Sequence, residues 1–151
     1  MVIAGLGGQG ILRASDILAE VAFRAGMDVK KSEVHGMSQR GGSVNSDVRF
    51  GRRVFSPLVS RGEADFLVLL APELTEHFQD YLKPGGELLS AETIDLAALP
   101  SRRALNIAML GRLSRRLEFE ESLWLEAIRR SFRPELVPAN EAAFRLGREA
   151  G

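Results

Sequence analysis

Residues 2–10 read Val-Ile-Ala-Gly-Leu-Gly-Gly-Gln-Gly, a short apolar run followed by a turn rich in glycine. From Ile11 to Ala25, apolar residues then recur at steps of three and four, which is typical of an amphipathic helix. Gly26 supplies the helix stop. The order strand, glycine turn, helix predicts an α/β fold.

The middle of the chain continues with strand patterns. Met27 to Glu33 and Val44 to Phe50 alternate apolar and polar residues, as half-buried strands do. Gly51-Arg52 could turn the second of these strands into a hairpin with Arg53 to Phe55, and strands joined so closely must be antiparallel. Because the apolar run Phe66 to Leu70 is typical of a central strand covered on both faces, we expect a mostly parallel but mixed sheet.

Helices should dominate the second half of the chain. Pro72 to about Leu82 predicts a helix, Lys83 to Gly86 a turn, and Glu87 to Leu89 a short strand. Three further helices are expected within the segments 104–117, 120–132 and 138–146. The whole chain, residues 1–151, is interpreted as a single three-layer α/β/α domain with a helical C-terminal third.

Composition restricts the function. Twenty basic and twenty acidic residues cancel, which argues against a nucleic-acid partner. No apolar stretch approaches the roughly 18 residues of a membrane span and no secretory signal is visible, so we expect a cytoplasmic protein. There is no cysteine and there are only two histidines, so neither an iron–sulfur cluster nor another metal site is expected on this chain. No catalytic residue is assigned.

The glycine turn is the first candidate site. Glycines let a backbone approach a phosphate, and a helix N-terminus offers free N–H groups and a positive dipole end. Glu33 stands near the place of the acidic residue in a dinucleotide-binding unit, so a stand-alone NAD(P)- or nucleotide-binding module is one hypothesis. The alternative is a tight turn that binds no ligand. The candidate cofactor-binding residues are Gly5, Gly7, Gly8, Gln9 and Gly10.

A second polar, glycine-rich segment runs from His35 to Ser43, and its pattern predicts a shaped loop. Arg40 can bind a carboxylate or phosphate through two parallel hydrogen bonds. This segment could contact a partner chain or a small ligand, and the two roles are compatible. The candidate residues are His35, Met37, Ser38, Gln39, Arg40, Gly41, Gly42 and Ser43.

The glycine turn from Gly5 to Gly10, the stretch from Glu33 to Val44, and Val48-Arg49-Phe50-Gly51 together resemble the gamma-type domain of 2-oxoacid:ferredoxin oxidoreductases. The central motif is most similar to that of the indolepyruvate:ferredoxin oxidoreductase beta subunit. Further matches come in order along the chain: Phe55-Ser56-Pro57-Leu58, Gly62-Glu63-Ala64-Asp65, Tyr81-Leu82-Lys83-Pro84-Gly85-Gly86, and Asn106.

The resemblance implies a reaction and a distribution of its cofactors between two subunits. The family decarboxylates a 2-oxoacid oxidatively on thiamine diphosphate, gives an acyl-CoA, and passes electrons through iron–sulfur clusters to ferredoxin. Thiamine and clusters are expected on a larger partner subunit, and this chain serves assembly, with a possible contact to coenzyme A. The family has a longer stretch between Leu89 and Asn106, so this chain is expected to be a shortened variant.

Overall fold

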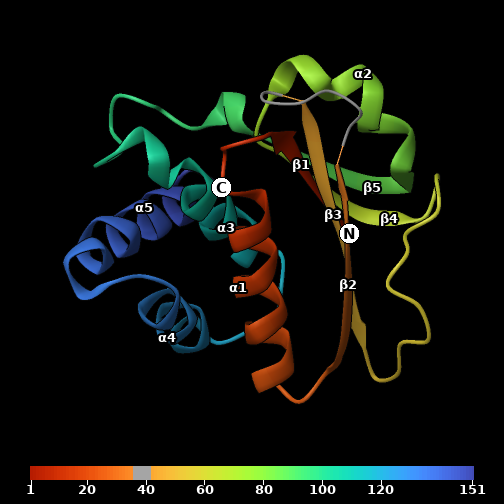
Figure 1. Cartoon of the computed structure of the whole chain (residues 1–151), viewed down its shortest axis with the longest axis horizontal. Helices are drawn as coiled ribbons and strands as arrows, with labels where there is room; N and C mark the ends of the chain where they lie inside the picture. Colours follow the sequence, from red (N-terminus) through yellow and green to blue (C-terminus); the bar gives the residue numbers. More distant parts are fainter. Residues whose placement is uncertain (36–41) are drawn as a thin grey trace.

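The computed structural model describes residues 1–35 and 42–151 of the chain, with the backbone alone at His35. Its described residues form one five-stranded sheet in the order β2-β3-β1-β4-β5 (Figure 1). β1 pairs with β4 and β4 with β5 in parallel, whereas β3 is antiparallel to both β1 and β2. The expected mixed sheet is confirmed, with β3 alone running against the other strands. The strands are β1 (Val2–Leu6), β2 (Asp28–His35), β3 (Ser43–Gly51), β4 (Ala64–Leu69) and β5 (Leu82–Ser90).

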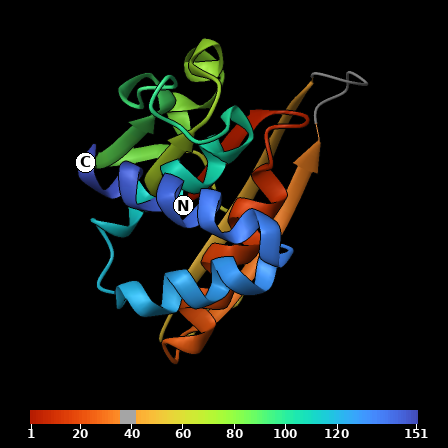
Figure 2. The same ribbon diagram turned by 90° about the vertical axis from the view of Figure 1, so that its left-hand side faces the viewer.

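Most helices lie on one face of the sheet, as Figures 1 and 2 show. They are α1 (Ile11–Arg24), α3 (Leu105–Ser114), α4 (Glu121–Ser131) and α5 (Val137–Glu149). Their apolar faces build a large core around Trp124 and Phe144, both fully buried. The predicted helical C-terminal third is therefore confirmed, with boundaries close to those expected from the apolar periodicity.

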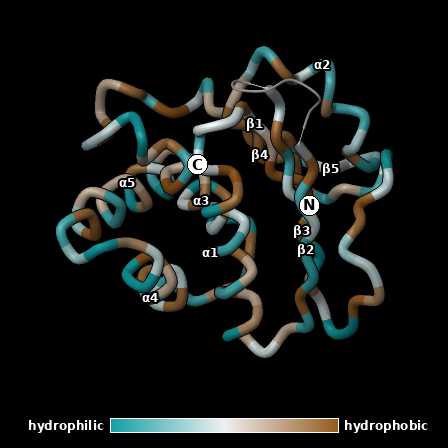
Figure 3. Tube along the Cα trace, viewed as in Figure 1, coloured by the Kyte–Doolittle hydropathy of each residue, from teal (hydrophilic) through white to brown (hydrophobic). Residues whose placement is uncertain are grey.

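The opposite face of the sheet carries a thinner layer. It consists of the segment 52–63 and the four-residue helix α2 (Thr75–Phe78), which is flanked by short 3₁₀ turns. Val59 and Phe78 pack there against Val2, Leu67 and the other inward residues of β1 and β4. Because β1 and β4 are covered on both sides, they are mostly apolar (Figure 3), and the charged exception is Asp65 near the start of β4.

Three local predictions are wrong. β3 does not form a hairpin with Arg53 to Phe55: its two edges are taken by β1 and β2, and residues 52–60 contain no strand. The helix predicted from Pro72 is reduced to α2 and its 3₁₀ turns. The predicted turn at Lys83 to Gly86 is instead the first half of β5, which pairs with β4 with a shift in register. Proline biases the residue before it toward extended backbone, so the helix ends before Pro84.

The helices α3 and α5 approach each other unusually closely at two glycines. A Cβ atom added at Gly147 would lie 1.7 Å from the Ala108 carbonyl oxygen on α3. A Cβ added at Gly111 would lie 2.0 Å from the Phe144 carbonyl oxygen on α5. The contact is therefore backbone against backbone, and it holds α3 in a fixed position relative to the C-terminal helix.

Within the described ranges, the structure contains no helix that is both long enough and apolar enough to cross a membrane.

Candidate functional site

The glycine turn links β1 to α1 at the carboxyl ends of the parallel strands β1 and β4. Gly8 and Gly10 have φ angles of 88° and 77°, in the left-handed region that favours glycine. Gly10 is the N-cap of α1 and offers no side chain to cap it, so the first N–H groups of the helix face the turn unsatisfied by a cap. They and the positive end of the helix dipole can stabilise an anion.

Gln9 makes two hydrogen bonds to the main chain at the turn. Its Oε1 accepts a hydrogen bond from the Leu6 N–H at 2.7 Å, and its Nε2 donates to the Leu70 carbonyl at 3.4 Å. The side chain thereby ties the end of β1 to the end of β4. Of the predicted cofactor-binding residues, Gln9 uses both ends of its amide to shape the turn. Gly5 leaves room for this amide, because a Cβ there would lie 2.5 Å from Gln9 Oε1.

Asn106, in the first turn of α3, fixes the other end of the turn. Its Nδ2 donates to the Gly10 carbonyl at 3.1 Å, and the side chain is almost fully buried. A Cβ at Gly10 would lie 2.4 Å from the same Nδ2, so both the conformation and the space at position 10 require glycine. In the sequence, Asn106 stands out only as a match to the family pattern, without a role. A contact across 96 residues leaves no local pattern to find.

Around the turn lies a groove of about 900 Å³. It is lined by the turn from Leu6 to Leu12 and by side chains of α1, the start of α3 and the start of α5, including Arg13, Arg103 and Asn140. The Arg13 guanidinium stacks on the Phe132 ring, 4.8 Å from its centroid, and is thereby held at the rim. The groove is large enough for a ligand of nucleotide size.

Its local charge favours an anion. Asp16, the acidic residue among those lining the groove, pairs with Lys31 at 2.5 Å. Lys31 also binds Glu33 at 2.6 Å. Burial lowers the pKa of Lys31, but the hydrogen bonds to these two carboxylates outweigh it and raise that pKa above its ordinary value. Arg13 and Arg103 outnumber Asp16 among the residues that line the groove, so its charge balance is positive.

The second candidate segment reaches the same edge of the sheet. Ser43 pairs with Leu6 in the β1–β3 ladder, and the Gly7 N–H donates to the Gly42 carbonyl at 2.9 Å. His35, at the end of β2, is paired with Val44 through its backbone. The structure thus brings Gly42 and Ser43 to the glycine turn. The rest of the segment lies outside the described residues: Met37, Ser38, Gln39, Arg40 and Gly41.

The sequence matches the family described as pyruvate ferredoxin/flavodoxin oxidoreductase over residues 1–150. The chain belongs to this family.

Relatives in this oxidoreductase family are enzyme subunits. The indolepyruvate oxidoreductase subunit IorB of Thermococcus kodakarensis is 33% identical, with 99% of this chain and 94% of that subunit aligned. IorB of Pyrococcus horikoshii is 48% identical over 86 residues, which cover 57% of this chain and 43% of that subunit. The first alignment runs over 190 positions, more than the 151 residues of this chain, so that relative carries residues that this chain lacks.

Solved structures share the fold. The gamma subunit of a keto/oxoacid ferredoxin oxidoreductase from Geobacter sulfurreducens matches with a TM-score of 0.78 and 23% identity, over 99% of this chain and 95% of that one. A 2-oxoglutarate:ferredoxin oxidoreductase from Magnetococcus marinus, solved with 2-oxoglutarate, coenzyme A and succinyl-CoA bound, matches with a TM-score of 0.79 and 24% identity. That match covers 99% of this chain and 30% of the other.

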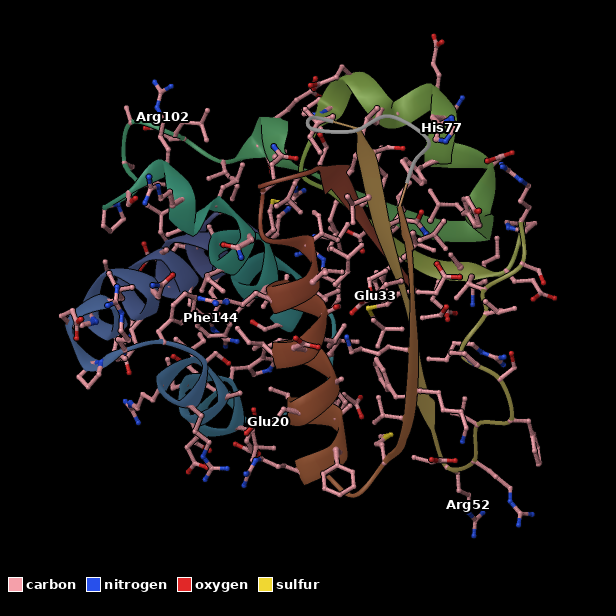
Figure 4. All side chains as sticks on the ribbon, viewed as in Figure 1. Glu20, Glu33, Arg52, His77, Arg102 and Phe144 are labelled. Atoms are coloured by element: carbon pink, nitrogen blue, oxygen red, sulfur yellow. The ribbon has the colours of Figure 1, made fainter. Side chains whose placement is uncertain are left out.

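The strand order disfavours the dinucleotide-binding alternative for this family member. In a Rossmann fold the second strand lies beside the first, and its terminal carboxylate reaches the ribose. Here β3 separates β2 from β1. Glu33 lies on β2, next to α1 (Figure 4), and its carboxylate is bound to Lys31. The predicted ribose-binding residue is therefore one strand too far away and already paired.

The donor atoms of the chain do not suit the family's redox cofactors. The sequence has no cysteine, so no thiolate can bind an iron–sulfur cluster. Among the described residues, no group of three or more histidine, aspartate or glutamate side chains could hold a metal ion. The glycine turn does suit a phosphate, because it combines backbone N–H groups with Arg13 and Arg103.

Proposed function

We propose that this chain is the small, cluster-free subunit of a cytoplasmic 2-oxoacid:ferredoxin oxidoreductase that acts on indolepyruvate or another aryl pyruvate. A larger subunit would bind thiamine diphosphate and the iron–sulfur clusters and pass electrons to ferredoxin, with an acyl-CoA as the product. Residues 1–151 would act as one gamma-type domain. The observation that carries the proposal is the near full-length alignment with an indolepyruvate oxidoreductase subunit. The lack of cysteine supports the assignment of the clusters to the partner.

Within this assembly, the groove at the glycine turn would receive a phosphate group of coenzyme A. Three features support this role: the uncapped N-terminus of α1, the left-handed Gly8 and Gly10, and the arginines Arg13 and Arg103. The groove also lies where the chain's connections diverge. α1 leaves β1 over one face of the sheet and α2 leaves β4 over the other, and ligands of open α/β sheets bind outside such switch points.

The segment His35 to Ser43 would contact the larger subunit near its active site. Its last residues, Gly42 and Ser43, lie beside the glycine turn, so one edge of the domain would present both motifs. Replacing Arg40 by Ala should then weaken assembly or turnover while leaving the thermal midpoint of the isolated chain unchanged. A complex with full affinity and full activity would count against this role.

The function is tested by producing the chain together with the larger subunit of its complex under anaerobic conditions. The co-purified complex should be brown, contain thiamine diphosphate, and reduce ferredoxin in the presence of coenzyme A. Its rate with indolepyruvate should exceed the rates with pyruvate, 2-oxoisovalerate and 2-oxoglutarate. The larger subunit alone is the control and should be much less active. A preference for an aliphatic oxoacid would refute the substrate, and purification of the chain alone would refute the assembly.

A charge introduced at Gly8 tests the phosphate site. Asp and Asn both tolerate the left-handed backbone of this position, and nothing lies within 4 Å of an added Cβ. The two variants therefore differ in charge but hardly in shape. At about 6 Å and an effective dielectric constant near 20, repulsion of a phosphate by the carboxylate is worth about 2–3 kcal/mol. G8D should raise the KM for coenzyme A by about 30-fold or more relative to G8N; equal KM values would exclude a phosphate there.

A further inference from the structure

The strand β2 forms one edge of the sheet, and its outer side is open. It pairs with β3 on one side, and no described strand pairs with its other side (Figure 2). All eight residues of β2 pair in register with β3, without a bulge, a proline or a glycine. The opposite edge strand, β5, contains Pro84, Gly85 and a register shift, which weaken strand pairing. β2 is therefore the regular edge of the sheet, to which a further strand can add.

The pairing of β3 with β1 shows which main-chain groups of β2 face outward. The Val48 N–H donates to the Met1 carbonyl at 2.9 Å, and the Val48 carbonyl accepts from the Met1 nitrogen at 2.8 Å. Such groups alternate between the two sides of an antiparallel strand, so Arg49 turns its N–H and C=O toward Lys30 of β2. The same alternation directs the N–H and C=O groups of the odd-numbered residues from Val29 to His35 at the open edge.

The charges of β2 restrict how a second copy of the chain can pair with it. A two-fold axis perpendicular to the sheet keeps every side chain on its own face, so one residue must lie opposite itself at the centre. A centre at Lys30 or Lys31 brings two lysines together, and a centre at Glu33 brings two glutamates together. A centre at Ser32 instead places Lys31 of each copy opposite Glu33 of the other. The sequence of β2 is thus complementary to itself in this register.

The register centred on Ser32 also suits the hydrogen bonds and the existing ion pairs. Lys31 and Glu33 both direct their main-chain groups outward, so each exchanges two hydrogen bonds with the other across the axis. Their side chains lie on the face of α1, where Lys31 pairs with Asp16 at 2.5 Å and with Glu33 at 2.6 Å. The same residues of a second copy extend this cluster with charges of alternating sign.

We infer that β2 is a dimer interface, through which two copies of the chain join their sheets as antiparallel strands centred on Ser32. The pairing places Val34, which is 48% exposed in the single chain, opposite Lys30 of the second copy, whose aliphatic part covers it. It also gives protein partners to main-chain groups that otherwise bond to water. The inference does not depend on the proposed function, because it uses the residues of β2 alone.

Sedimentation equilibrium of the purified chain tests the charge pairing. The wild type should dimerise, and K31E and E33K should each weaken the dimer Kd by about 30-fold or more, because symmetry turns two attractive contacts into two repulsive ones. An equimolar mixture of K31E and E33K should form heterodimers with a Kd near that of the wild type, since every glutamate then meets a lysine. K30E is the matched control: it changes the neighbouring lysine, which lies opposite Val34, and should alter the Kd by about threefold or less.

The register itself is tested by S32C, because the chain has no cysteine. In the inferred pairing the two Ser32 residues form a non-hydrogen-bonded pair with Cα atoms about 4.5 Å apart, within the range of a disulfide. Oxidation should therefore convert S32C into a covalent dimer. K30C is the control, since the two Lys30 residues lie four positions apart along the paired strands, roughly 13 Å, and should not cross-link.

Three results would overturn the inference. The first is a wild-type chain that stays monomeric at every concentration. The second is a dimer whose Kd K31E leaves unchanged, or in which S32C cross-links no faster than K30C, because that dimer uses another surface. The third is a monomer whose K31E variant no longer binds the larger subunit, which would assign the open edge of β2 to that subunit. All three leave the proposed function intact.

Discussion

The close approach of α3 and α5 makes Gly147→Ala a demanding test of the packing. The added Cβ would lie 1.7 Å from the Ala108 carbonyl oxygen, whereas real Cβ atoms keep at least 3.0 Å. The obstacle is backbone, so no side-chain rotation can relieve it. We therefore expect α5 to move away from α3 by about 1.3 Å, the difference between these distances.

Two opposing effects determine how much Gly147→Ala changes the free energy of unfolding. Alanine favours a helix over glycine by about 1 kcal/mol, which alone would stabilise the variant. Overpacking costs typically 1–3 kcal/mol and sometimes more, and a gap of this width also removes much of the dispersion attraction between facing atoms. Because the clash is with backbone, we place its cost at the upper end. The net loss should be about 2 kcal/mol, which lowers the Tm of a domain of this size by roughly 4–8 °C.

Circular dichroism during heating and urea denaturation measure this loss. Gly51→Ala is the control, since the same substitution there brings the new Cβ within 4 Å of nothing and its φ is not left-handed. The control should change stability by about 0.5 kcal/mol or less. A Gly147→Ala chain as stable as the wild type, or more stable, would refute the close packing of the two helices.

Three further outcomes are expected. Q9A loses both hydrogen bonds of its amide to the main chain; the free energy of unfolding in urea should fall by about 1–2 kcal/mol, and an unchanged value would contradict its role in the turn. Asn106→Leu keeps the volume but removes the donor to the Gly10 carbonyl; amide hydrogen exchange in the glycine turn should accelerate, and equal exchange would show that the bond does not hold the turn. The hydrogen bond from Lys83 lowers the pKa of Asp65, so this pair stabilises the fold above the ordinary carboxyl pKa and loses its effect as the pH falls through the lowered value. K83A should therefore lower the Tm at neutral pH by an amount that shrinks as the carboxyl is protonated in acid, and a constant difference would argue against the pairing.

The parts of the fold that sequence patterns predict are those whose partners are local. The amphipathic repeat of α1 and the apolar run of β4 identify these elements because each needs only a buried face. The alternation in β3 identifies a strand but not its partners, because pairing depends on which distant strands reach its edges. The hairpin with Arg53 to Phe55 is the nearest choice in sequence, and the longer pairings with β1 and β2 satisfy more backbone groups.

In the candidate site, too, local sequence patterns predict some features, whereas contacts between distant residues determine others. Its position follows from glycines between a strand and a helix, and the structure does place a groove there. The inward role of Gln9 and the clamp from Asn106 follow from the three-dimensional arrangement alone. Both side chains form hydrogen bonds with main-chain atoms. Such bonds require no particular residue type at the partner position, so the sequence carries no pattern that reveals them.

The bond between Asn106 and Gly10 has a consequence for biosynthesis. A chain emerges from the ribosome with its N-terminal part first, so residues 5–10 are exposed long before Asn106 is made. Until α3 docks, the nascent turn lacks its clamp and offers no finished pocket to a cellular metabolite. A fragment that ends before residue 105 would contain the complete glycine motif, but its turn should not keep the folded conformation. Ligand binding at this turn would then report that translation has passed α3.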